Sequence, residues 1–206
     1  MIPLYDESRS ANTTSWITVF LIVSSAVIFF VTYPELDSFV GLYGIFPDAF
    51  LSGRNIFSAF SSLFLHANIA HLLGNMLFLW VFGESLERKF GGLKFLLFYL
   101  ACALGAAFLY SFAAVDKTVP AIGASGAIAG ILGGYFIFFP KNKIKSLVPL
   151  IFLWVFWSVP AVFFIALWFA LQFFGVLYGG TDMVAYWGHI GGFFTGFFLA
   201  GLLKKF

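Results

Sequence analysis

The chain of 206 residues has very few charged side chains. Only 10% of its residues are Asp, Glu, Lys or Arg, whereas soluble domains average about a quarter. The formal net charge is only +2, which excludes the strongly basic surface typical of nucleic-acid-binding proteins. The scarcity of charge therefore argues against a soluble protein and against a nucleic-acid partner.

Cysteine is also almost absent. The single Cys102 lies in an apolar run, which excludes an internal disulfide and any CxxC redox or zinc motif. The start of the chain lacks the basic region of a secretory signal, because residues 1–15 carry Asp6, Glu7 and Arg9. The first apolar run ends at Tyr33-Pro34 without a small-residue cleavage site, so we expect it to be retained as a membrane span.

Long apolar runs dominate the rest of the sequence, which is 62% hydrophobic and contains 31 Phe. Runs of about 18 apolar residues predict membrane-spanning helices. We predict an all-α membrane protein, a six-transmembrane-helix bundle forming a single domain over 1–206. Residues 1–15 form a short N-terminal segment, and 33–69 form a long outer loop partly in the membrane interface. The predicted spans are 16–32, 70–82, 93–113, 125–139, 161–179 and 184–203, with 147–160 an interfacial lead-in to the fifth.

The distribution of lysines and arginines predicts how this bundle is oriented in the membrane. With six crossings, nine of them fall on one side and only Arg54 and Lys117 on the other. Basic residues concentrate on the cytoplasmic side of membrane proteins, which predicts that both termini are cytoplasmic. An odd number of crossings would place one of the Lys-rich ends outside.

Four polar residues then fall at a similar depth, in the outer half of the bilayer. His71 and Asn75 lie one turn apart on the second span, Ser125 begins the fourth, and His189 lies near the start of the sixth. Ionisable groups within a membrane are costly, so they usually face the bundle interior and mark function. Glycines at four-residue spacing, such as Gly126 and Gly130, are by themselves typical of ordinary helix packing in membranes.

A serine beside a histidine has a specific chemistry. The hydroxyl becomes a nucleophile when an adjacent base accepts its proton. Glycine stripes on the fourth and sixth spans would let the two helices approach, which brings Ser125 and His189 together. We expect no Asp or Glu at the depth of His189, since Asp182 should lie slightly outside it, and therefore predict a dyad.

Three motifs in this order resemble those of the rhomboid family of intramembrane serine proteases. They are Gly123-Ala-Ser125-Gly126, His66-Ala-Asn-Ile-Ala-His71-Leu-Leu-Gly-Asn75 and Gly188-His189-Ile-Gly-Gly192-Phe-Phe-Thr-Gly196. The turn at Glu87-Arg88 and Gly91 is also similar to that family. The resemblance covers residues 58–201.

The resemblance implies a role for each matched residue. Ser125 is the nucleophile and His189 the base, while Asn75, His71, Gly123 and the Ser125 amide stabilise the oxyanion. His66, Gly126, Gly192 and Gly196 are structural supports. Three positions depart from the family pattern: Phe57 and Ser58 replace a Trp-Arg pair, and Ala129 replaces a tyrosine that stacks on the histidine. The group that orients His189 is therefore not identified by the sequence.

The implied activity is endoproteolysis of transmembrane protein substrates near the outer face, without a metal or organic cofactor. We expect a multi-pass protein of the lipid bilayer, in the plasma or cell inner membrane; its oligomeric state is open. Three alternatives remain: a non-proteolytic relative that binds membrane proteins, a metal site built from His66, His71 and His189, and a small transporter or channel. The last normally shows paired repeats, and none is clear here.

Overall fold

Helices make up most of the computed structural model, which describes residues 1–8, 15–150, 153–178 and 185–205. Within these residues, four helical segments are long and apolar enough to cross a membrane: Trp16–Tyr43, Ile69–Phe90, Gly92–Ala113 and Ala161–Tyr178. These include the first, second, third and fifth predicted spans. The crossing number of six and the cytoplasmic termini stay predictions.

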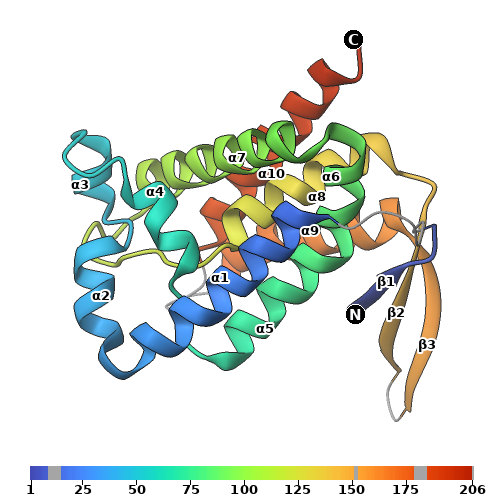
Figure 1. The fold of residues 1–206 in the computed structure, drawn as a ribbon, viewed down its shortest axis with the longest axis horizontal. Coiled ribbons are helices and arrows are strands. Elements are labelled where there is room, and N and C mark those ends of the chain that lie inside the picture. Colours follow the sequence, from blue (N-terminus) through green and yellow to red (C-terminus); the bar gives the residue numbers. More distant parts are fainter. Residues whose placement is uncertain (9–14, 151–152, 179–184, 206) are drawn as a thin grey trace.

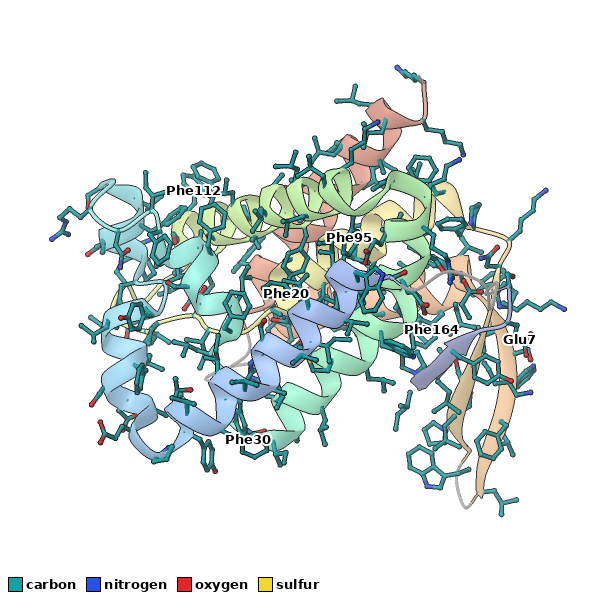
Figure 2. All side chains as sticks on the ribbon, viewed as in Figure 1. Glu7, Phe20, Phe30, Phe95, Phe112 and Phe164 are labelled. Atoms are coloured by element: carbon teal, nitrogen blue, oxygen red, sulfur yellow. The ribbon has the colours of Figure 1, made fainter. Side chains whose placement is uncertain are left out.

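The outside of the bundle is covered with large apolar side chains. Phe20 and Phe30, labelled in Figure 2, lie on α1 (Trp16–Thr32). Both are more than half exposed, whereas Phe95 and Phe164 are buried within the bundle. Apolar surface of this extent is expected where a helix faces lipid instead of water.

The long predicted loop after the first span is largely helical. α1 continues through the 3₁₀ turn η1 (Tyr33–Glu35) into α2 (Leu36–Tyr43). Short helices follow: α3 (Pro47–Leu51), α4 (Ser58–Ser61) and the 3₁₀ turn η2 (Ser62–Phe64). Figure 1 shows these elements gathered at one end of the bundle.

The second span is one helix in three parts: α5 (Ile69–Phe78), the π-helical segment η3 (Leu79–Gly83) and α6 (Glu84–Phe90). The side chain of Asn68 caps α5 by accepting a hydrogen bond from the His71 amide at 2.9 Å. At its other end, Gly91 has φ +79°, a conformation that favours glycine, and α7 (Gly92–Ala113) follows.

α8 (Ser125–Phe138) lies inside the bundle, packed against α7 and α10 (Tyr186–Leu203), while α9 (Ala161–Tyr178) packs at the side (Figure 1). α8 has 14 residues, and every residue from Ala127 to Tyr135 is buried. At about 1.5 Å per residue it is shorter than a hydrocarbon core of roughly 30 Å. A helix enclosed by other helices does not need the full length of a lipid-facing span, so the half-buried Ser125 begins a helix whose middle is fully enclosed.

Buried polar side chains form hydrogen bonds between elements at the end of the bundle opposite Ser125. The Glu87 carboxylate accepts hydrogen bonds from the amides of Ile17 and Thr18, at 2.9 and 2.7 Å, and from the Thr18 hydroxyl at 2.8 Å. These amides belong to the first turn of α1, which has no intrahelical acceptors for them. Asp6 accepts from the Tyr135 hydroxyl at 2.6 Å, which ties the N-terminal strand to α8.

The prediction of a wholly helical chain is wrong at this end. Three strands form an antiparallel sheet in the order β1-β2-β3: β1 (Ile2–Asp6), β2 (Lys143–Leu150) and β3 (Leu153–Pro160). The apolar residues 147–160 therefore form most of a hairpin instead of a simple lead-in to the fifth span. Valines and aromatic residues, which favour strands, are concentrated between Val148 and Val159.

Candidate active site

Two pairs of glycines bring α8 and α10 into direct backbone contact. A Cβ added at Gly192 would overlap the carbonyl oxygen of Gly126, and one at Gly196 would overlap that of Gly130. Any side chain at these positions would push the helices apart. The glycine motifs of the two helices therefore meet one another, as helix packing through small residues in membranes requires.

This contact places Ser125 beside His189. The Ser125 Oγ lies 2.8 Å from the His189 Nε2, which is hydrogen-bond distance for a hydroxyl and an imidazole. Ser125 is the first residue of α8, so its amide has no intrahelical acceptor. His189 lies in the first turn of α10, where its amide donates to the Ala185 carbonyl.

The second ring nitrogen of His189 contacts a residue of α9. Gln172 Oε1 lies 2.7 Å from His189 Nδ1, and Gln172 Nε2 donates to the Trp168 carbonyl at 2.9 Å. The Trp168 ring also lies beside the imidazole, with centroids 5.8 Å apart. Gln172 is the contact of His189 that the motifs did not identify. The sequence alone favours a structural role for it, and the available signal for a site residue was the cost of a lone amide in an apolar helix. Asp182 lies outside the described residues.

Gly123 joins the start of α8 to the polar face of α5. Its φ of +104° requires glycine, and an added Cβ would lie only 2.7 Å from His71 Nε2 and 3.4 Å from Asn75 Nδ2. Its own amide donates to the Ser62 carbonyl at 2.8 Å. Gly123 therefore admits the His71 and Asn75 side chains close to Ser125, but its amide is already engaged and is not a free oxyanion donor.

His71 and Asn75 present unused hydrogen-bond donors at this point. His71 Nδ1 accepts from the Ala67 amide at 3.4 Å, which leaves the proton of the neutral ring on Nε2, the nitrogen beside Gly123. Asn75 Nδ2 is buried without a hydrogen-bond partner among the described residues. Leaving a buried donor unpaired is costly, so two donors facing one point suggest a site for a bound oxygen atom.

His66 lies behind this pair and not in contact with Ser125. It is fully buried, its ring packs edge-on against His71 with centroids 5.2 Å apart, and its Nδ1 lies 3.3 Å from the Phe64 carbonyl. Burial and, to a lesser degree, the nearby His71 lower the pKa of His66 to about 4, so the ring is neutral at neutral pH. This position fits a supporting role.

A metal site built from the three histidines finds no support in this arrangement. Both ring nitrogens of His189 are engaged, by Ser125 and Gln172. Among the described residues, no three His, Cys, Asp or Glu side chains are placed to hold a metal ion.

A small cavity of about 30 Å³ lies next to Ser125 and His189. Its lining contains many alanines and glycines from several elements, among them Ala59, Ala103, Ala106, Ala107, Ala121, Gly126, Ala185 and Gly188. The cavity has room for a water molecule or a short side chain and no more.

Comparison with known proteins identifies a family for most of the chain. Residues 53–206 match the family model described as Rhomboid domain. The chain is 37% identical over 145 residues to RHOMBOID-like protein 4 of Arabidopsis thaliana, covering 68% of this chain and 32% of that protein. It is 36% identical over 139 residues to Rhomboid protease GluP of Bacillus subtilis, covering 68% of this chain and 24% of that protein. The matched part is thus a third or less of the length of these two relatives.

The glycine contact between α8 and α10 can be tested by substitution. We expect Gly192→Ala to destabilise the protein by about 1–3 kcal/mol, as overpacking of a tight interior commonly does, because the new methyl group meets the Gly126 carbonyl. The measurement is the thermal unfolding midpoint in detergent. Gly201→Ala, on the same helix with open space around it, is the control and should leave the midpoint unchanged. Equal midpoints for both variants would contradict the proposed contact.

Proposed function

Because the chain belongs to the rhomboid family, we propose that it is an intramembrane serine endopeptidase that cleaves transmembrane segments of other membrane proteins. One observation carries this proposal: the 2.8 Å contact between Ser125 Oγ and His189 Nε2 inside a multi-pass membrane protein. The similarity to a relative named as a rhomboid protease supports it further. The residues involved are Ser125 as nucleophile and His189 as general base.

The reaction follows from the placement of the protons. Ser125 Oγ attacks the carbonyl carbon of the scissile peptide bond while its proton passes to His189 Nε2. The resulting oxyanion lies among the Ser125 amide, the Asn75 amide group and the His71 Nε2–H. His189 then donates the proton to the leaving amine as the C–N bond breaks, and water, activated by the same ring, releases the acyl group from Ser125.

Substrate size follows from the cavity beside Ser125. Its alanine and glycine lining leaves room for a short side chain only, so the residue cleaved should be small. A transmembrane helix must also unwind locally to expose its peptide bond, which residues with low helix propensity facilitate.

The proposed location is the plasma or cell inner membrane, with Ser125 toward the outer face. The orientation follows from the distribution of lysine and arginine along the chain. The names of some relatives state another cellular location, such as RHOMBOID-like protein 6, mitochondrial, of Arabidopsis thaliana.

Purified, reconstituted protein with a single-span substrate tests the activity. We expect Ser125→Ala and His189→Ala to lower the cleavage rate by roughly 10³-fold or more, because each removes half of the nucleophile–base pair. Ser38→Ala, at an exposed position on α2, is the control and should cleave like the wild type. Labelling by a fluorophosphonate should depend on Ser125. Cleavage by Ser125→Ala at the wild-type rate would disprove the mechanism, and substrate binding without labelling or cleavage by the wild type would identify a non-proteolytic binder.

The cavity predicts a strong preference at the cleaved position. In a series of single-span substrates that differ only there, Ala or Ser should be cleaved at least about tenfold faster than Phe, because a ring cannot enter the space beside Ser125. The comparison is made on kcat/KM. A Phe substrate cleaved at the same site as fast as the Ala substrate would show that this cavity does not receive the side chain.

A further inference from the structure

Gln172 is the residue in contact with the far side of the proposed base. It is buried, 7% exposed, on a helix whose other buried residues are Ala161, Phe164 and Ile165. Its amide nitrogen donates to the Trp168 carbonyl, so its oxygen is the atom directed at His189. An amide oxygen only accepts hydrogen bonds, and therefore the proton of the imidazole must be on Nδ1.

This choice of tautomer decides what the other nitrogen can do. With the proton on Nδ1, the Nε2 lone pair faces the Ser125 hydroxyl and can accept its proton. Three hydrogen bonds then run in one direction: the Ser125 hydroxyl donates to His189, His189 donates to Gln172, and Gln172 donates to the Trp168 carbonyl. A carboxylate performs the same orienting task in soluble serine proteases.

We propose that Gln172 is a positioning residue that fixes the tautomer and orientation of His189, so that the base is assembled only while α9 lies against α10. The proposal rests on the proposed function. Gln172 and Trp168 are both on α9, so the orientation of His189 depends on a helix that is otherwise largely exposed at the side of the bundle. Displacement of α9 would separate Gln172 from His189 and leave the ring free to rotate.

Two variants of Gln172 and one control on the same helix test this role. Gln172→Leu keeps a similar volume without the acceptor, Gln172→Glu restores an acceptor with a charge, and Leu171→Ala changes an exposed neighbour. We expect kcat to fall by roughly 10- to 100-fold in Gln172→Leu with KM changed less than about threefold, since the group acts through the base. Gln172→Glu should recover most of this loss, and Leu171→Ala should equal the wild type.

The pH profile separates positioning from simple packing. The titratable groups that face His189 within the described residues are His71 and Tyr186, and neither is changed in these variants. A carboxylate at position 172 favours the charged imidazolium, which cannot act as a base. As the pH is lowered, Gln172→Glu should therefore lose activity at a higher pH than the wild type does. If Gln172→Leu retains wild-type kcat, or if the Leu and Glu variants lose activity equally with unchanged profiles, the proposal is wrong. Failure of the wild type to react with a fluorophosphonate would instead reject the proposed function.

A different observation concerns the β-sheet at the opposite end from Ser125. Residues paired across neighbouring strands lie on the same face of the sheet. One face contains the buried Ile144 and Ser146 near the bundle and, farther from it, Val148, Val155 and Trp157. Trp157 is 60% exposed there. On the other face Trp154 and Phe156 are exposed to a similar degree, while Lys143 and Lys145 lie near the bundle. The outer part of the hairpin is therefore apolar on both faces, and its base is basic.

The position of the sheet indicates what surrounds it. β3 leads directly into α9, a candidate membrane span, so the base of the hairpin lies at the membrane surface. Figure 1 shows the sheet projecting sideways from the bundle, across the direction of α7. Strands of eight residues reach about 26 Å at roughly 3.3 Å per residue. Such a projection stays at the level of the lipid headgroups instead of extending into water.

We infer that the outer part of the hairpin, residues 153–157, inserts into the interface of the bilayer and anchors the adjoining end of α9. Tryptophan favours the boundary between headgroups and acyl chains, and lysines favour the phosphates next to it. The tryptophans at the outer part of the hairpin and the lysines at its base fit these two layers.

Spin labels on the full chain test this inference in liposomes of phosphatidylcholine and phosphatidylglycerol. On a Cys102→Ala background, single cysteines replace Trp154 or Trp157, with Phe30→Cys on α1 as the lipid reference and Ser52→Cys as the water reference. We expect the hairpin labels to be reached by oxygen and shielded from a water-soluble nickel chelate, as at Phe30. Accessibility like that of Ser52 would overturn the inference. Spin–spin broadening that disappears when labelled protein is mixed with unlabelled protein would also overturn the inference, because it would show that a second copy of the chain covers the hairpin.

Discussion

The direct backbone contact between α8 and α10 is the constraint on which the candidate site depends. Glycines 126, 130, 192 and 196 have no side chains to separate the helices, and their positions leave no room for one. Inside a membrane, water exclusion gives little drive for two apolar helices to associate, so close packing must hold them. The same contact that stabilises the centre of the bundle therefore sets the distance between Ser125 Oγ and His189 Nε2. Stability and site geometry here have one physical origin.

Polar groups are placed around this contact at an evident energetic cost. Asn75 and His71 direct donors at the start of α8, where Gly123 gives them space, and Asn75 Nδ2 has no partner within the described residues. A fold selected only for stability would pair such donors or replace them with apolar groups. Their arrangement is understandable if an oxygen atom that carries negative charge is bound there for part of a reaction.

The sequence predicted the helices closely because long apolar runs and their breaks are strong, local signals. The predicted spans 16–32, 93–113 and 161–179 differ from the observed helices by at most one residue. The pairing of Ser125 with His189 followed from motif order and depth. The partner of His189 was missed, since an amide such as Gln172 gives no local sign of which way it points. The strands at 143–160 were missed because an apolar run next to a span has the same composition whether it forms a hairpin or an interfacial segment.

α9 connects these parts of the molecule. Near its middle, its residues Trp168 and Gln172 contact the imidazole, and at its N-terminal end it continues directly from β3. About half of its side chains are exposed, and its contacts with the bundle are mainly aromatic, such as Phe169 stacked on Phe193 of α10 with ring centroids 4.1 Å apart. α9 contacts its neighbours through side chains such as these, whereas α8 and α10 meet directly through their backbones and cannot separate without breaking the glycine contact. Ser125 and His189, the proposed nucleophile and base, thus belong to helices that stay together, whereas Gln172, which contacts His189, belongs to α9. Displacement of α9 would therefore leave the helices of Ser125 and His189 together but remove Gln172 from the imidazole, so the proposed base is complete only while α9 lies against α10.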